Sequence, residues 1–165
     1  MSAEADLGAV FDAHVGAEFE QQDIDATMAT MAADPYVWHV PTLMGGDGYD
    51  AVRAFYSGSF VGKWPADTKA EQVGRTVGGN RVVEELIMSF THDVQLDVLL
   101  PGVQPTGRRV ELPVVVVMGF EGEKVAYEHI YWDQGSLLAQ VGLLDPAEVP
   151  VAPDQARALR ERQRA

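Results

Sequence analysis

Residues 128–133 read Glu-His-Ile-Tyr-Trp-Asp, a run that is typical of a β-strand and yet carries ionisable side chains. Successive residues of a strand point to opposite faces, so Glu128, Ile130 and Trp132 share one face and the three residues between them share the other. Whichever face points inward takes an ionisable group with it, and burying such a group is costly unless it is paired. Because that cost is tolerated mainly at functional sites, the stretch indicates a pocket with acid–base chemistry.

The composition is that of a globular protein. With 165 residues, 47% of them hydrophobic and 22% charged, the chain is long enough for one domain with a substantial core. The longest apolar run, 114–118, is far shorter than the roughly 20 residues of a membrane helix. Residues 1–6 lack the basic and apolar regions of a signal peptide, and the absence of cysteine excludes disulfides and thiolate sites. We therefore expect a cytoplasmic protein with one domain over 1–146 and a linker and tail over 147–165.

The net charge is −13, from 12 basic and 25 acidic residues. Nucleic acids and anionic membranes both require a basic surface, so neither is an expected partner. The exception is an arginine cluster in the tail, at Arg157, Arg160, Arg162 and Arg164. We expect this tail to be a solvated or subunit-contacting end of a helix.

The first third of the chain predicts helices. An amphipathic first helix follows from the helical spacing of Leu7, Val10, Phe11, His14, Val15, Glu18 and Phe19. Met28, Met31 and Ala32 line a second predicted helix that Asp34-Pro35 stops. A short strand over 36–40, a glycine-rich loop over 45–48 and a third helix over 49–62 follow.

The remainder predicts strands. Segments 70–77 and 81–91 flank Gly78-Gly79-Asn80, a tight hairpin signal, and two further strands are predicted over 109–120 and 124–132. A short helix around 137–144 ends the domain. Helices first and hairpin-linked strands later predict an α+β fold, with helices on one face of a curved antiparallel sheet.

Several local strings resemble the NTF2-like superfamily, in particular its SnoaL-like polyketide-cyclase branch and the related limonene-epoxide hydrolases. The matching strings are 39–41 (His-Val-Pro), 45–48 (Gly-Gly-Asp-Gly), 90–92 (Phe-Thr-His), 105–107 (Pro-Thr-Gly) and 128–133 running into 137–144. The resemblance spans residues 7–146. It implies an NTF2-like cone whose curved sheet and helices enclose a pocket, but the same cone supports many reactions.

The resemblance also implies a set of site residues. Pocket-facing positions of the relatives fall on Glu128, Ile130 and Trp132 in the last strand, on Glu85 and Ser89 in strand 81–91, and on His39 in the first strand. We therefore predict Glu128, His39 and Glu85 as the catalytic residues. Two carboxylates in one apolar pocket would repel each other, which raises at least one pKa toward neutrality. The predicted substrate contacts are Trp132, Ile130, Tyr56, Phe55, Ser89, Arg75 and His92.

Two alternatives remain open for strand 81–91. A register shifted by one residue would turn Glu84 inward in place of Glu85, together with Leu86, Met88, Phe90 and His92. Glu85 could also be structural, pairing with Arg75 or Arg81 of the same hairpin.

This sequence differs from the characterised relatives at their catalytic positions. The residues that activate water in the epoxide hydrolases would fall on Ile87, Ser89 and Ile130, so we do not expect epoxide hydrolysis. The acid–base aspartate of the polyketide cyclases would also fall on Ile130. Glu128, one pocket-facing position away, could take over the proton transfer for a differently placed substrate, or it could have another role.

Other titratable residues have structural interpretations. We expect His129 and Tyr131 on the outer sheet face, Asp133 as a helix N-cap and His14 as a packing residue. His39, His92 and His129 could ligate a metal with a carboxylate, but no local spacing supports a site. We therefore expect no metal and no cofactor.

The hypothesis is a cofactor-independent enzyme that acts on a small, apolar carbonyl or cyclic substrate, by isomerisation, cyclisation or addition of water. One alternative is a module that binds a small molecule without chemistry. Another is a structural domain. A homodimer is expected through the outer sheet face, where Arg109, Glu111, Val115 and Val117 lie.

Overall fold

The computed structural model describes residues 6–163. Residues 1–5, on which the prediction of no signal peptide partly rests, and Arg164 of the tail lie outside the described residues. The helices are α1 (Leu7–Gly16), α2 (Ile24–Ala29), α3 (Tyr49–Phe55), α4 (Gln134–Gln140) and α5 (Gln155–Gln163), with π-helical turns η1 (Ala17–Gln21) and η2 (Tyr56–Phe60). The strands are β1 (Met31–His39), β2 (Met44–Asp47), β3 (Lys69–Gly78), β4 (Arg81–Thr91), β5 (Arg109–Glu121) and β6 (Lys124–Trp132).

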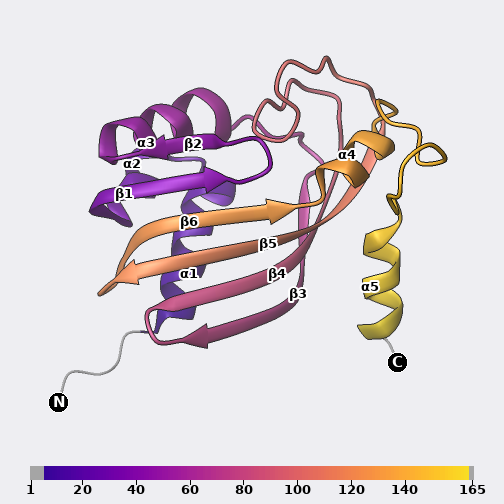
Figure 1. The fold of residues 1–165 in the computed structure, drawn as a ribbon. Coiled ribbons are helices and arrows are strands. Elements are labelled where there is room, and N and C mark those ends of the chain that lie inside the picture. The colour runs from indigo at the N-terminus through magenta and orange to yellow at the C-terminus, as the bar shows by residue number, and fades with distance from the viewer. Residues whose placement is uncertain (1–5, 164–165) are drawn as a thin grey trace.

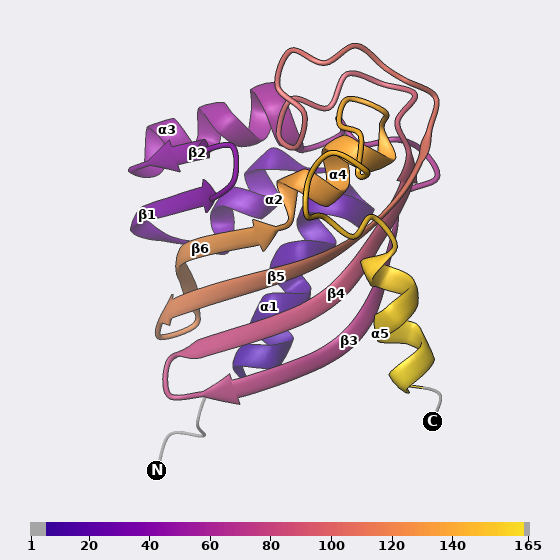
Figure 2. The same ribbon diagram turned by 45° about the vertical axis from the view of Figure 1, so that its right-hand side comes forward.

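The strands form one curved sheet in the order β2-β1-β6-β5-β4-β3. Every neighbouring pair is antiparallel except β1 and β6, which run parallel. The prediction of an antiparallel sheet is therefore wrong for this one pair. In Figures 1 and 2, α1 crosses behind the sheet, and α2 and α3 lie near its β1–β2 end. The predicted α+β fold is confirmed, and the helices on this face and the sheet enclose the core.

Two predicted boundaries are wrong near the first strand. Met31 and Ala32 begin β1 instead of continuing a helix, because α2 ends at Ala29 and the Thr30 hydroxyl turns back to the Thr27 carbonyl. The predicted glycine loop contains strand β2. A Cβ on Gly46 would lie 2.5 Å from the Ala51 carbonyl carbon, so this glycine allows close packing against α3.

The C-terminal helix α5 packs against the outer sheet face. Its Arg160 donates to Glu71 of β3 and to Glu111 of β5, each over 2.7 Å. Glu71 pairs with Ile87 and Glu111 with Ser89 across β4, and directly paired residues share a face. Arg157 and Arg162 are exposed, as expected of a solvated tail, whereas Arg160 binds its own sheet. No helix within residues 6–163 is long and apolar enough to cross a membrane.

Candidate active site

A cavity of about 270 Å³ lies between the inner sheet face and the helices. Most of its wall is apolar, and the lining includes Phe11, Phe60, Leu86, Met88, Val114 and Ile130. The ionisable or hydroxyl side chains in the wall are Glu18, Glu20, His39, Tyr56, Thr68 and Glu128. A cavity of roughly 150 Å³ holds a benzene molecule, so this one suits a ligand of about bicyclic size.

The cavity shows which face of β4 points inward. Leu86 and Met88 line it, whereas Glu85 is exposed. Ile87 and Ser89 are buried on the opposite face, which α5 partly covers. The predicted inward register with Glu85 is therefore wrong, and the alternative register is correct.

Glu84 shares the inner face of β4 but does not line the cavity. It accepts hydrogen bonds from Arg75 Nε over 2.5 Å and from Gln72 over 2.6 Å. Arg75 also binds Asp12 of α1 over 2.7 Å. Arg75 therefore pairs with Glu84 rather than Glu85, and neither residue is part of the cavity wall.

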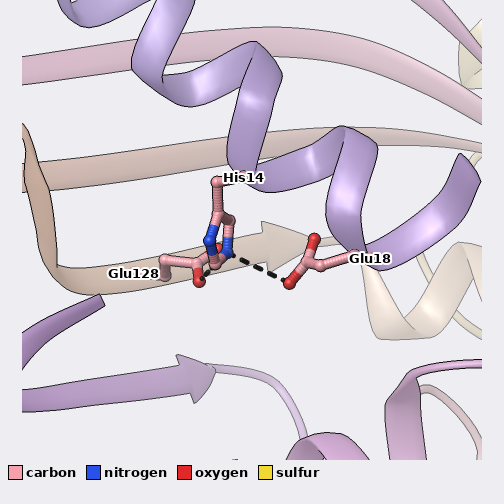
Figure 3. A group of neighbouring side chains, drawn as sticks. All are labelled: His14, Glu18 and Glu128. Atoms are coloured by element: carbon pink, nitrogen blue, oxygen red, sulfur yellow. Dashed lines mark hydrogen bonds and ion pairs between the residues drawn. The ribbon is translucent and has the colours of Figure 1, made fainter. Parts of the chain in front are cut away.

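Three polar side chains of the cavity wall, Glu18, Tyr56 and Glu128, meet at the buried His14. His14 Nε2 of α1 lies 3.1 Å from Glu128 Oε1 of β6 and 3.2 Å from Glu18 Oε1 of η1. The Tyr56 hydroxyl of η2 donates to the same Glu128 oxygen over 2.6 Å. Figure 3 shows the His14 ring between the two carboxylates. We call these four residues the proton cluster.

Local backbone geometry positions the cluster. His14 and Glu18 lie four residues apart, so their side chains share one helix face. Glu18 and Tyr56 each lie in a π-helical turn that follows an α-helix. Such turns are rare and shift the side-chain direction relative to the preceding helix, and they are frequent at functional sites.

The cluster separates the pKa values of its two carboxylates. Burial alone would lower the pKa of His14, but Glu18 and Glu128 together raise it to about 10. Burial raises the pKa of Glu18, and its contact with His14 only partly opposes this. Burial also disfavours ionised Glu128, yet the His14 charge and the hydrogen bonds from His14 and Tyr56 outweigh it and lower the pKa. At neutral pH, Glu128 is thus the ionised carboxylate, and Glu18 is the one that holds a proton more readily.

His39 forms a second polar point in the wall. Its ring packs against those of Phe55, Phe60 and Trp132, with centroids 5.3, 5.4 and 6.1 Å away. Burial lowers the pKa of His39 to about 4, against the opposing effect of Glu128. The imidazole is therefore neutral near pH 7, and its Nδ1 is buried without a hydrogen-bond partner.

The structure brings some of the other predicted substrate contacts to the cavity. Trp132, Ile130 and Tyr56 line it. Phe55 lies behind His39 and outside the lining. His92 is buried away from the cavity, where its Nδ1 contacts the Thr106 hydroxyl over 3.1 Å. With Arg75 and Ser89 also outside the lining, the predicted set is only partly assembled.

Two residues of the cluster were not predicted as site residues. His14 was expected to be a packing residue, and Glu18 was noted only for its helical spacing. Both are buried, His14 in α1 and Glu18 in η1. The signal in the sequence was a histidine and a glutamate four residues apart within the apolar stripe, because a polar pair in such a stripe needs a partner.

His14, Glu18 and Glu128 also form a group that could hold a divalent cation, since their ligand atoms lie within 4.8 Å of one another. His39, His92 and His129, the set considered from the sequence, lie in different places. His129 is on the outer face, where it contacts the Tyr36 hydroxyl over 3.0 Å. The expectation of a site without metal stays a prediction.

Comparison with known proteins gives a consistent family and fold. The sequence pattern of the SnoaL-like domain matches residues 11–128. No curated protein matches the chain.

Solved structures share the fold at low sequence identity. IdmH of Streptomyces antibioticus, a proposed polyketide cyclase, superposes with a TM-score of 0.64 at 17% identity, over 84% of this chain and 99% of IdmH. A proposed SnoaL-like polyketide cyclase of a Jannaschia species superposes with a TM-score of 0.64 at 17% identity. The match covers 86% of this chain and 97% of the Jannaschia chain. A Catenulispora acidiphila protein with a ketosteroid isomerase-like fold, solved in complex with trimethylamine, superposes with a TM-score of 0.62 at 16% identity. The match covers 85% of this chain and 95% of the Catenulispora chain. At these identities the likeness shows the NTF2-like fold alone.

Proposed function

Because the chain belongs to the SnoaL-like domain family, we propose that it is an enzyme that transfers a proton on a small, largely apolar carbonyl or cyclic substrate. The proposal requires no cofactor. The family supports several activities on one cone, so the argument rests on the cavity rather than on the fold.

The observation that carries the proposal is the pair of carboxylates that share one imidazole in an apolar wall. Environments that push the pKa values of two carboxyl groups apart assign an acid and a base. Glu128, whose pKa is lowered, is the base. Glu18, whose pKa is raised, is the acid. Glu18 thus takes the second carboxylate role that the sequence assigned to Glu85.

His39 supports the reaction from a neighbouring strand. It pairs with Ile130 on β6, two residues beyond Glu128, so the two side chains face the same cavity. A neutral imidazole carries one N–H, which can donate to a substrate carbonyl and stabilise the charge that develops there. An imidazolium is not needed for this role.

These residues fit one elementary step. Glu128 removes a proton from the carbon next to the substrate carbonyl, and the electron pair moves to the carbonyl oxygen, which His39 stabilises. Glu18 then returns a proton to the same or a conjugated carbon, which gives exchange or isomerisation. If the carbanion attacks a second carbonyl of the same substrate instead, Glu18 protonates the new alkoxide and a ring is formed.

The test uses β-tetralone, a bicyclic ketone with acidic α-protons and a size that suits the cavity. In heavy water, the wild-type protein should accelerate exchange of these protons well above the buffer rate, as followed by proton NMR. Glu18→Gln should slow this exchange, since it removes one of the two proton carriers. A probe that binds, as judged by titration calorimetry, but exchanges at the buffer rate would instead support the small-molecule binding module.

A further inference from the structure

The proton cluster extends beyond the cavity through the second ring nitrogen of His14. His14 Nδ1 lies 2.6 Å from the Thr30 hydroxyl oxygen, at the end of α2. The same hydroxyl lies 2.6 Å from the Thr27 carbonyl oxygen. His14 is fully buried and Thr30 is half-buried, so bulk water is largely kept from this contact.

Counting donors fixes the direction of these two hydrogen bonds. A hydroxyl has one proton to donate, and a carbonyl oxygen can only accept. The Thr30 proton must therefore go to Thr27, because two oxygens at 2.6 Å without a proton between them would repel each other. Toward His14, the Thr30 oxygen can then only accept, so His14 Nδ1 carries a proton.

We infer that Thr30 is a positioning residue: it holds the proton of His14 on Nδ1, so that Nε2 is the only ring atom that exchanges a proton with Glu18 and Glu128. The charged and titratable groups that face Nε2 are Glu18 of η1, Glu128 of β6 and Tyr56 of η2. Protons pass between the two carboxylates through Nε2, while Nδ1 keeps its own. The kinetic part of this inference rests on the proposed function, whereas the statement on the ring nitrogens does not.

Removing the hydroxyl has a defined consequence. In Thr30→Val, Nδ1–H loses its acceptor in a buried place, which favours a neutral ring with its proton on Nε2. The positive charge beside Glu128 is then weaker, so Glu128 binds its own proton more tightly. Thr30→Ser keeps the hydroxyl and should restore the wild-type state.

The experiment is nitrogen-15 NMR of the histidine side chains, which is tractable because the chain has only four histidines. At neutral pH, the wild-type His14 ring should show protons on both nitrogens. Thr30→Val should lower the pKa of His14 by about one unit or more, since a hydrogen bond to a charged group is lost. Thr30→Ser should return that pKa toward the wild-type value. Thr106→Val removes the matching hydroxyl at His92 Nδ1 and should change the His92 signals alone.

The kinetic readout is the pH profile of β-tetralone exchange. In Thr30→Val, the acid limb should move to higher pH, because ionised Glu128 is required and its proton is held more tightly. In Thr30→Val, kcat should fall roughly tenfold while KM stays unchanged, and Thr30→Ser should recover the wild-type kcat.

Two NMR results overturn the inference. One is a wild-type His14 ring with unprotonated Nδ1, which decides the matter even if Thr30→Val does not fold. The other is an unchanged His14 in folded Thr30→Val. If the ring nitrogens behave as expected but the α-protons of the ketone exchange only at the buffer rate, the proposed function fails. The role of Thr30 in keeping a proton on His14 Nδ1 then still stands.

Discussion

At the scale of single residues, the central feature is a buried histidine between two buried glutamates. Burying separate ions would cost several kcal/mol each, so the contacts among His14, Glu18 and Glu128 must offset that cost. Two carboxylates and one imidazolium leave one excess negative charge, which a proton on Glu18 can neutralise. The cluster therefore holds a proton that it can release into the cavity.

This arrangement predicts how stability depends on pH. The pKa of His14 is about 10 in the folded protein and near the ordinary 6.5 when unfolded. Its contribution is fully present below pH 6.5 and is lost as the pH rises toward 10, with a slope of about 1.4 kcal/mol per pH unit for one proton. Urea unfolding across this range measures it. His14→Gln should flatten the slope, and a wild-type protein with constant stability over the same range would contradict the assignment.

At the scale of elements, the strand ends position the site. Asp133 follows β6 directly, and its side chain accepts from the Ser136 amide over 3.1 Å, so it caps α4 as predicted. It also binds Gln155 at the start of α5. One residue thus connects the strand that carries Glu128 with two C-terminal helices.

Asp133→Ala should therefore reduce the free energy of unfolding by about 1 kcal/mol or somewhat more, since a helix cap and a contact to α5 are lost. Denaturant unfolding measures this change. Glu123→Ala, an exposed change in the β5–β6 turn, is the control and should have little effect. Equal stability of the two variants would show that the cap contributes nothing.

Strand and hairpin positions could be predicted from the sequence because alternation and turn residues are local signals. Strands β4 (Arg81–Thr91) and β6 (Lys124–Trp132) have the same bounds as the predicted segments 81–91 and 124–132. The inward face of β4 could not be predicted in this way, because each face combines a glutamate with apolar residues. Glu84 shares its face with Leu86 and Met88, and Glu85 shares the other with Ile87. Pairing of His14 with Glu128 joins residues far apart in sequence, so it appears only in the folded chain.

At the scale of the whole molecule, the outer sheet face divides into two parts. Arg109 and Glu111, expected at a dimer interface, already bind Asp67 and Arg160 of the same chain. Val115 and Val117 remain half-buried on this face. Beside them lies an aromatic group of Tyr36, Tyr127, His129 and Tyr131, in which Tyr36 and Tyr127 stack with centroids 5.3 Å apart. This part of the face is where we propose that two copies meet.

The wild-type protein should therefore be a dimer by light scattering after size-exclusion chromatography. Tyr131 is exposed and pairs with Val115 across the strands, so Tyr131→Glu should place a charge in the interface and give a folded monomer. Glu123→Ala serves again as the unaffected control. A wild-type monomer at all concentrations would contradict the proposed dimer and leave the cavity chemistry unaffected.

The most direct test of the central claim compares Glu128→Gln with Glu85→Gln in the β-tetralone exchange assay. Glu128 lines the cavity, whereas Glu85 is an exposed carboxylate on the outer face of the same sheet. The account predicts that Glu128→Gln lowers kcat by about a hundredfold or more, as expected for loss of a general base, with Glu85→Gln unchanged. Equal exchange rates in wild-type protein and a folded Glu128→Gln variant would contradict the claim that this carboxylate moves the proton.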